Sequence, residues 1–99
     1  MKSIQQFSPS MKQVLLSVLI PYGVVRVAIA GSFARGQARP DSDLDVVVSF
    51  RDPKSLLELV HIRHELSSAL GRNVDLITEK SISPYLLDSF QRDAMVILS

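Results

Sequence analysis

Two apolar segments near the middle of the chain have the pattern of buried β-strands. Val24 to Ala30 is rich in β-branched residues and uncharged except for Arg26, and Leu44 to Phe50 contains three consecutive valines. β-Branched residues fit the pleated surface of a strand, and unbroken apolar runs are typical of strands covered on both faces. These segments therefore predict two strands, joined by a short helix or turn over Phe33 to Gln37 and a polar connection.

Two longer segments have the spacing of amphipathic helices. Ser8 can cap a helix that Pro9 opens and that runs to about Ile20, because serine accepts bonds from free amides and proline suits the first turn. Lys54 to Leu70 has the clearest helical pattern, and Gly71 follows in the position that usually ends a helix. The pattern thus predicts one helix before the first strand and another after the second.

The second helix is predicted to turn one apolar side towards the core. The residues on this inner side are Leu56, Leu59, Val60, Ile62, Leu66, Ala69 and Leu70. Leu57, His61 and His64 lie roughly opposite, and for the two histidines contact with solvent or a partner is favoured over metal binding. For Leu57 and the apolar segment Tyr85-Leu86-Leu87, core packing is favoured over an exposed docking patch.

The remaining segments complete a mixed sheet covered by helices. Asn73 to Thr78 is a third predicted strand, Ser83-Pro84 begins a short helix that runs to about Gln91, and Ala94 to Leu98 is a candidate edge strand. This element order predicts an α/β (α+β) fold, with a mixed sheet of three to four strands flanked by helices. Because the chain is short and has no internal repeat or linker, residues 1–99 are expected to form one domain.

Composition excludes several classes of function. With 11 basic and 10 acidic side chains the chain is almost neutral, so no broad surface for direct nucleic-acid binding is expected. The absence of cysteine excludes disulfides and thiolate zinc sites. Met1 to Ser10 is polar, unlike a signal peptide, and no apolar run approaches the roughly 20 residues needed to span a bilayer. We therefore expect a cytoplasmic protein without a membrane partner.

Polar residues at the ends of the two central strands indicate nucleotide chemistry. Gly31-Ser32 directly follows the first strand, and Asp43-Leu44-Asp45 opens the second. Glycine lets the backbone approach a phosphate closely, a hydroxyl and free amides can donate to it, and carboxylates bind hard ions such as Mg²⁺. Because side chains alternate along a strand, Asp43 and Asp45 are expected to share a face, where their repulsion favours a divalent cation.

Asp75 is the other acid placed inside a predicted strand, within Val74 to Ile77. If that strand neighbours the strand of Asp43 and Asp45, the three acids form one cluster. Such a cluster could hold two Mg²⁺ ions, one directing a nucleoside triphosphate and one lowering the pKa of an attacking hydroxyl. Asp75 is then the candidate base.

Three well-known motifs fit the sequence poorly. Gly31 to Gly36 has the glycine spacing of a Walker A loop, but Gln37-Ala38 follows where lysine and a hydroxyl residue are required. The same two glycines are too few for a Rossmann fingerprint. The acids from Asp41 onward open like an EF-hand calcium loop, yet Val46 stands where that loop needs glycine.

The combined pattern resembles the minimal nucleotidyltransferases, small members of the DNA polymerase β-like superfamily. The matching positions are Gly31-Ser32, Arg35-Gly36, Ser42-Asp43-Leu44-Asp45 and Asp75, and the likeness covers nearly the whole chain. It implies a nucleotidyltransferase (polymerase β-like) fold with ATP as substrate. By position, the catalytic, Mg²⁺-binding acids correspond to Asp43, Asp45 and Asp75. The implied nucleotide-contacting positions are Gly31, Ser32, Arg35 and Ser42.

The same resemblance implies a protein partner. Many such stand-alone domains are antitoxins encoded beside an HEPN-domain ribonuclease toxin, and some silence it by transferring AMP from ATP to a toxin tyrosine. Two alternatives stay open: a non-catalytic antitoxin that neutralises by binding, and nucleotidyl transfer to a small molecule or an RNA end. The second alternative usually requires an additional acceptor domain, for which 99 residues leave no room.

Overall fold

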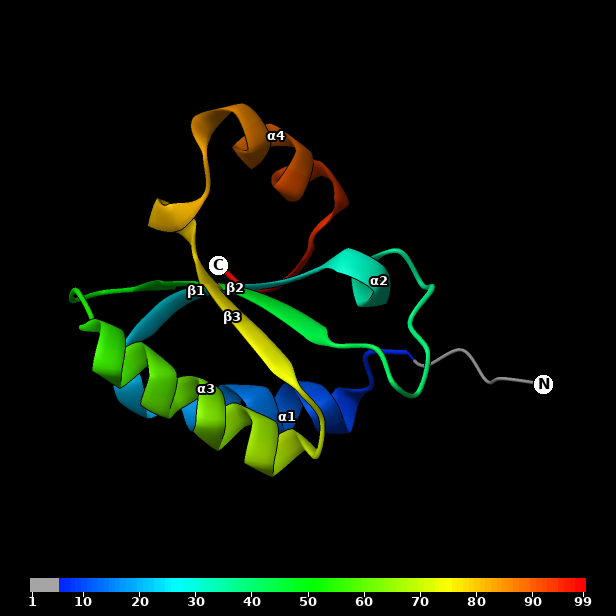
Figure 1. The fold of residues 1–99 in the computed structure, drawn as a ribbon, viewed down its shortest axis with the longest axis horizontal. Helices are drawn as coiled ribbons and strands as arrows, with labels where there is room; N and C mark the ends of the chain where they lie inside the picture. The colour runs from blue at the N-terminus through cyan, green and yellow to red at the C-terminus, as the bar shows by residue number, and fades with distance from the viewer. Residues whose placement is uncertain (1–5) are drawn as a thin grey trace.

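A four-stranded mixed β-sheet with helices on both sides forms the fold in the computed structural model, which describes residues 6–99 apart from the side chains of residues 87 and 89–91 (Figure 1). In chain order the elements are α1 (Pro9–Leu19), η1 (Ile20–Tyr22), β1 (Val24–Ala30), α2 (Gly31–Ala34), β2 (Leu44–Phe50), α3 (Leu56–Leu70), β3 (Val74–Thr78), η2 (Glu79–Ser81), α4 (Pro84–Asp93) and β4 (Met95–Leu98). The predicted mixed sheet flanked by helices is therefore confirmed.

The strand order in the sheet is β3-β2-β1-β4. β1 runs antiparallel to both β2 and β4, whereas β2 and β3 are parallel. A parallel pair needs a long crossover connection, and α3 is the helix in that connection. The register of the parallel pair places Asp45 opposite Asp75. The condition on which the acid cluster depended, adjacency of the second and third strands, is thus met.

The predicted bounds of the two central strands are confirmed to the residue. α3 begins two residues later than predicted, at Leu56, because Ser55 is its N-cap. The Ser55 hydroxyl accepts a bond from the Glu58 amide at 3.1 Å, and the Glu58 carboxylate accepts one from the Ser55 amide at 3.1 Å. This reciprocal capping box satisfies amides that have no partner within the helix. The hydrogen-bonded cap therefore sets the start of the helix.

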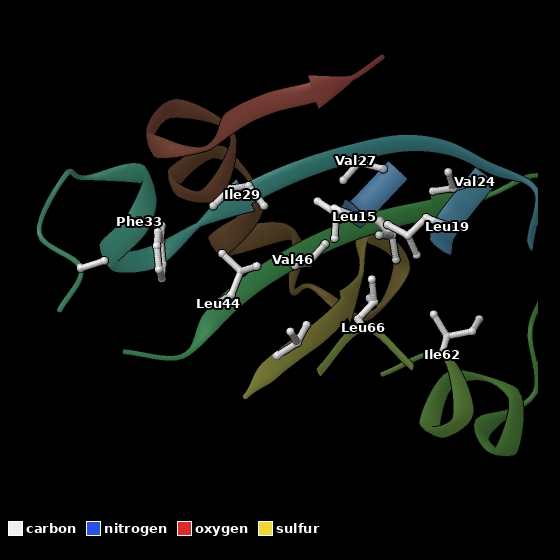
Figure 2. Packing of buried hydrophobic residues seen from close by; sticks show 13 residues of the cluster. Leu15, Leu19, Val24, Val27, Ile29, Phe33, Leu44, Val46, Ile62 and Leu66 are labelled. Atoms are coloured by element: carbon white, nitrogen blue, oxygen red, sulfur yellow. The ribbon is translucent and has the colours of Figure 1, made fainter. Parts of the chain in front are cut away.

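The main core lies between the sheet and the pair α1 and α3, which cover the same face (Figure 1). Figure 2 shows side chains from both helices converging on the strands. The largest fully buried side chains are Leu15, Leu19, Ile29, Leu44, Ile62, Leu66, Val27, Val46, Val48 and Val74. On β2, buried Leu44, Val46 and Val48 alternate with Asp45, so the Asp45 side chain lies on the opposite face of the sheet.

The prediction for the inner side of α3 is only partly right. Ile62 and Leu66 are fully buried, but Leu56 is 76% exposed and Val60 is 38% exposed, and Ala69 is exposed as well. α3 packs mainly on α1 and β3, so only a narrow stripe with a four-residue spacing is enclosed. The apolar pattern of this helix is wider than the surface that covers it.

Core packing was also the wrong expectation for Leu57, Tyr85 and Leu86. Leu57 is 82% exposed, Tyr85 is 94% exposed and Leu86 is 54% exposed, while the side chain of Leu87 lies outside the described part of the structure. α4, which carries Tyr85 and Leu86, stands on the side of the sheet away from α1 and α3 (Figure 1). It therefore does not share the main core. Within residues 6–99, no helix has the length and apolar character required to cross a membrane.

Truncating Leu66 should destabilise the protein far more than truncating Leu57 on the same helix. Leu66 is fully buried and Leu57 is 82% exposed. We expect Leu66→Ala to lower the free energy of unfolding by about 2 to 5 kcal/mol through lost burial and a cavity. Leu57→Ala should change it by less than about 0.5 kcal/mol. Urea denaturation measures both, and equal losses would contradict the assigned inner face.

Candidate active site

The turn between β1 and α2 brings the backbone of Gly31 against the carboxylate of Asp45. β1 ends at Ala30, which pairs with Asp45 of β2, and Gly31 follows with a φ of +68°. This left-handed conformation is strained for residues with a side chain. A Cβ at position 31 would in addition overlap the Asp45 carboxylate oxygen. Glycine is therefore required here both by backbone conformation and by the close approach of the acid.

α2 is held in place by a buried aromatic ring. Phe33 is only 2% exposed and belongs to the core cluster. Ser32, its neighbour, is partly exposed, and its carbonyl accepts a bond from the Gln37 amide at 2.8 Å. The Arg35 guanidinium is exposed, and its Nε donates to the Gln37 side chain at 3.4 Å. Phe33 thus anchors α2. Ser32 within this helix and Arg35 directly after it lie at the protein surface.

The three predicted acids lie on neighbouring segments of the sheet. Asp45 is partly buried on β2, Asp75 is exposed on β3 as its register partner, and Asp43 is exposed immediately before β2 begins. Burial raises the pKa of the Asp45 carboxyl, and repulsion by the charges of Asp75 and then Asp43 raises it further. The nearby Arg35 guanidinium acts in the opposite direction. The structure therefore brings Arg35 and the three acids within electrostatic reach of one another.

The carboxylates of the three acids suit a hard divalent cation that a bound substrate also coordinates. All three side chains offer carboxylate oxygens, and the charge on Asp45 is disfavoured as it stands. Within residues 6–99, no three acidic or histidine side chains are placed to hold a metal ion by themselves. Mg²⁺ typically uses one or two protein carboxylates and completes its shell with water and substrate phosphates. The arrangement suits that mode of binding rather than a closed protein cage.

Ser42 has a clear role in shaping the loop before Asp43. Its amide donates to the Arg39 carbonyl at 2.9 Å, and its hydroxyl accepts a bond from the Arg39 amide at 2.7 Å. With Pro40 in the second position, these bonds close a four-residue turn. The predicted contact of Ser42 with a nucleotide stays a prediction. What the hydroxyl does in this structure is to hold the turn.

Arg72 is a residue that reasoning from the sequence missed. One of its terminal nitrogens donates to the Ser42 carbonyl at 2.6 Å, and its guanidinium lies 4.9 Å from the centre of the Phe33 ring. In the sequence it stands between the glycine that ends α3 and the start of β3, where an arginine usually indicates only a solvated turn. No local pattern indicates that it reaches a loop thirty residues earlier in the chain.

Comparison with known proteins gives consistent matches along most of the chain. A family profile described as the nucleotidyltransferase domain matches residues 11–97. The chain is 40% identical over 87 residues to a Methanocaldococcus jannaschii protein provisionally named a protein adenylyltransferase, covering 88% of this chain and 94% of that protein. It is 32% identical over 76 residues to protein adenylyltransferase MntA of Thermococcus cleftensis, covering 77% of each.

Several solved structures share this arrangement of elements. A structure provisionally described as a minimal nucleotidyltransferase matches with a TM-score of 0.77 at 37% identity, covering 87% of this chain and 88% of that one. A crystal structure of a toxin–antitoxin with AMP-PNP matches with a TM-score of 0.81 at 21% identity, covering 89% and 73%. A complex of a tri-AMPylated Shewanella oneidensis HEPN toxin with an MNT antitoxin matches with a TM-score of 0.74 at 18% identity, covering 91% and 71%. The last two, at such low identity, share the fold.

Proposed function

The chain belongs to the nucleotidyltransferase domain family, and from this membership we propose that it is a Mg²⁺-dependent antitoxin that transfers AMP from ATP to a tyrosine hydroxyl of a partner HEPN ribonuclease toxin. The observation that carries the proposal is the packing of the Gly31 backbone against Asp45, which is in register with Asp75. Relatives named for protein adenylylation support a protein acceptor. The fold shared with an AMP-PNP complex supports ATP as the donor.

In the proposed reaction the tyrosine oxygen attacks the α-phosphorus of ATP while the bond from that phosphorus to pyrophosphate breaks. The phenolic proton passes to the Asp75 carboxylate, which is exposed and can meet an incoming hydroxyl. Products are AMP esterified to the tyrosine, pyrophosphate and one proton. No covalent intermediate on this chain is required, so catalysis consists of positioning and charge stabilisation.

Each site residue has a task that follows from its place. The Gly31 backbone and the Ser32 hydroxyl would bind the phosphates, and Arg35 would compensate their charge from the rim. Asp43, Asp45 and Asp75 would hold Mg²⁺ together with the substrate phosphates, and the ion when bound would neutralise phosphate charge and acidify the attacking hydroxyl. Asp45 is the central acid of the proposed metal site, because it lies between the Gly31 turn and Asp75 on the neighbouring strand.

A protein acceptor fits the openness of this face of the sheet. The main core lies on the other side, and both Asp43 and Asp75 are exposed. Small-molecule sites normally enclose most of their ligand, whereas these two carboxylates are exposed. A partner protein can supply both the acceptor and the missing wall. We therefore assign the acceptor to a protein surface that docks over the acids.

The test is transfer of α-labelled AMP from ATP, with Mg²⁺, to the product of the adjacent gene, which the proposal expects to be an HEPN protein. We expect label on the partner with wild type and none with the double variant Asp43→Ala plus Asp45→Ala. Mass spectrometry should place the added AMP on tyrosine. A stable complex without label would overturn the transferase assignment and favour neutralisation by binding. Label on a nucleotide or small molecule in place of the protein would overturn the assigned acceptor.

A further inference from the structure

Arg72 joins two segments that carry the site. Its terminal nitrogen donates to the Ser42 carbonyl at 2.6 Å, and its guanidinium stacks 4.9 Å from the centre of the Phe33 ring. Ser42 directly precedes Asp43, and Phe33 directly follows Ser32. The Arg72 side chain therefore connects the loop before Asp43 to α2, which carries Ser32, the residue proposed to bind phosphate.

The Arg72 backbone is itself well anchored. Its amide donates to the Ser67 carbonyl at 3.3 Å at the end of α3, and the Ser67 hydroxyl accepts a bond from the Val74 amide at 3.1 Å. One residue further on, the Asn73 carbonyl accepts a bond from the Leu44 amide at 3.0 Å. The arginine thus extends from the rigid junction of α3 and β3, not from a free loop.

The charge of Arg72 is used differently from that of Arg35. Arg35 lowers the pKa of Asp45, whereas Arg72 is not among the charges that shift it. Within residues 6–99, the arginine that pairs with a carboxylate is Arg26, whose partner is Glu79, whereas Arg72 is partnered by a carbonyl and a ring face. Such contacts fix geometry and leave the acids free to bind a cation.

We propose that Arg72 is a positioning residue that holds the Asp43 loop against α2, an inference that rests on the proposed nucleotidyl transfer. Asp43 follows the turn directly, so the position of its carboxylate depends on where the Ser42 carbonyl is held. Residues in the layer behind metal ligands typically change metal affinity or activity by about 10 to 100-fold when removed. In this role Arg72 acts on the reaction through Asp43.

The geometry requires arginine specifically. A planar guanidinium can stack on a ring with its face while donating a hydrogen bond from its edge. The ammonium of lysine is a compact point charge and cannot do both at once. Arg72→Lys should therefore fail to restore what Arg72→Gln loses. A role based on charge alone would instead be rescued by lysine.

The experiment compares Arg72→Gln and Arg72→Lys with the matched control Arg63→Gln, an exposed arginine on α3. In both Arg72 variants, the Mg²⁺ concentration for half-maximal AMP transfer should rise about tenfold or more, with a lower maximal rate. A loss of overall stability would reduce the amount of active protein without moving that concentration. Arg63→Gln should match wild type, and a wild-type Mg²⁺ profile in Arg72→Gln would overturn the proposal.

Amide hydrogen exchange gives a second measurement that does not depend on activity. In Arg72→Gln, exchange in residues 41–44 should accelerate about tenfold, while the core strand β1 keeps its protection. If wild type transfers no AMP, the proposed function fails, and exchange alone then decides whether Arg72 holds the loop. Unchanged exchange in residues 41–44 would overturn the positioning role whether or not transfer is observed.

Discussion

Replacing Asp45 with asparagine is expected to reduce AMP transfer by about a thousandfold while the fold is kept. The asparagine side chain has nearly the shape of aspartate, so it can occupy the space beside Gly31 and keep the register with Asp75. What the variant loses is the negative charge that would bind Mg²⁺. Initial rates of labelled AMP transfer to the partner measure this loss.

The matched control is Asp41→Asn, in the exposed turn before the site. It removes the same charge from the chain but is not one of the acids that shift the pKa of Asp45. We expect it to retain transfer within about threefold of wild type, because charges at the protein surface are screened by solvent and salt. Equal losses in the two variants would point to net charge instead of a specific ligand.

Stability should move in the opposite direction to activity. The charge on Asp45 is disfavoured by partial burial and by the nearby charges of Asp75 and Asp43. Asp45→Asn removes that repulsion, so its thermal midpoint should equal or exceed that of wild type. Such an exchange of stability for function is typical of residues kept for chemistry. Full activity in a folded Asp45→Asn variant would contradict the assigned role, and a thermal midpoint below that of wild type would contradict the expected effect on stability.

The strands that carry the site could be predicted from the sequence because their signal is local. β-Branched apolar runs over β1 and β2, each bounded by turn residues, gave bounds that match the structure to the residue. The cluster of acids was harder, since it required β3 to pair with β2. That pairing bridges a whole crossover helix and leaves no trace in local periodicity. The pairing of β3 with β2 could therefore be stated only as a condition for the acid cluster.

The features that were missed share a physical cause. Exposure of Leu56 and Leu57 depends on how far other elements extend over α3, which the helix's own pattern does not contain. Arg72 reaches Ser42 and Phe33 through tertiary contacts between residues far apart in the sequence. Residue type and spacing indicate which chemistry a segment can perform. They do not indicate which distant side chain keeps that segment in place.

Substituting Gly31 with alanine is expected to reduce AMP transfer by at least about a hundredfold, because small misplacements of reacting groups are costly. The added Cβ would overlap the Asp45 carboxylate, so either the acid or the glycine turn must move. Both outcomes would separate the backbone proposed to bind phosphate from the acid proposed to bind Mg²⁺. Alanine at a positive φ also costs roughly 1 to 2 kcal/mol of stability.

Gly23→Ala separates these two effects. Gly23 has a φ of +81° and nothing within 4 Å of an added Cβ, so it carries the backbone strain without the collision. Gly23→Ala should lose about 1 to 2 kcal/mol of stability, because alanine is strained at a positive φ at this position too. AMP transfer by the folded variant should equal that of wild type. Urea denaturation and transfer rates on both variants make the comparison. If Gly23→Ala lost as much activity as Gly31→Ala, general destabilisation would explain the effect, and the contact between Gly31 and Asp45 would have no special part in catalysis.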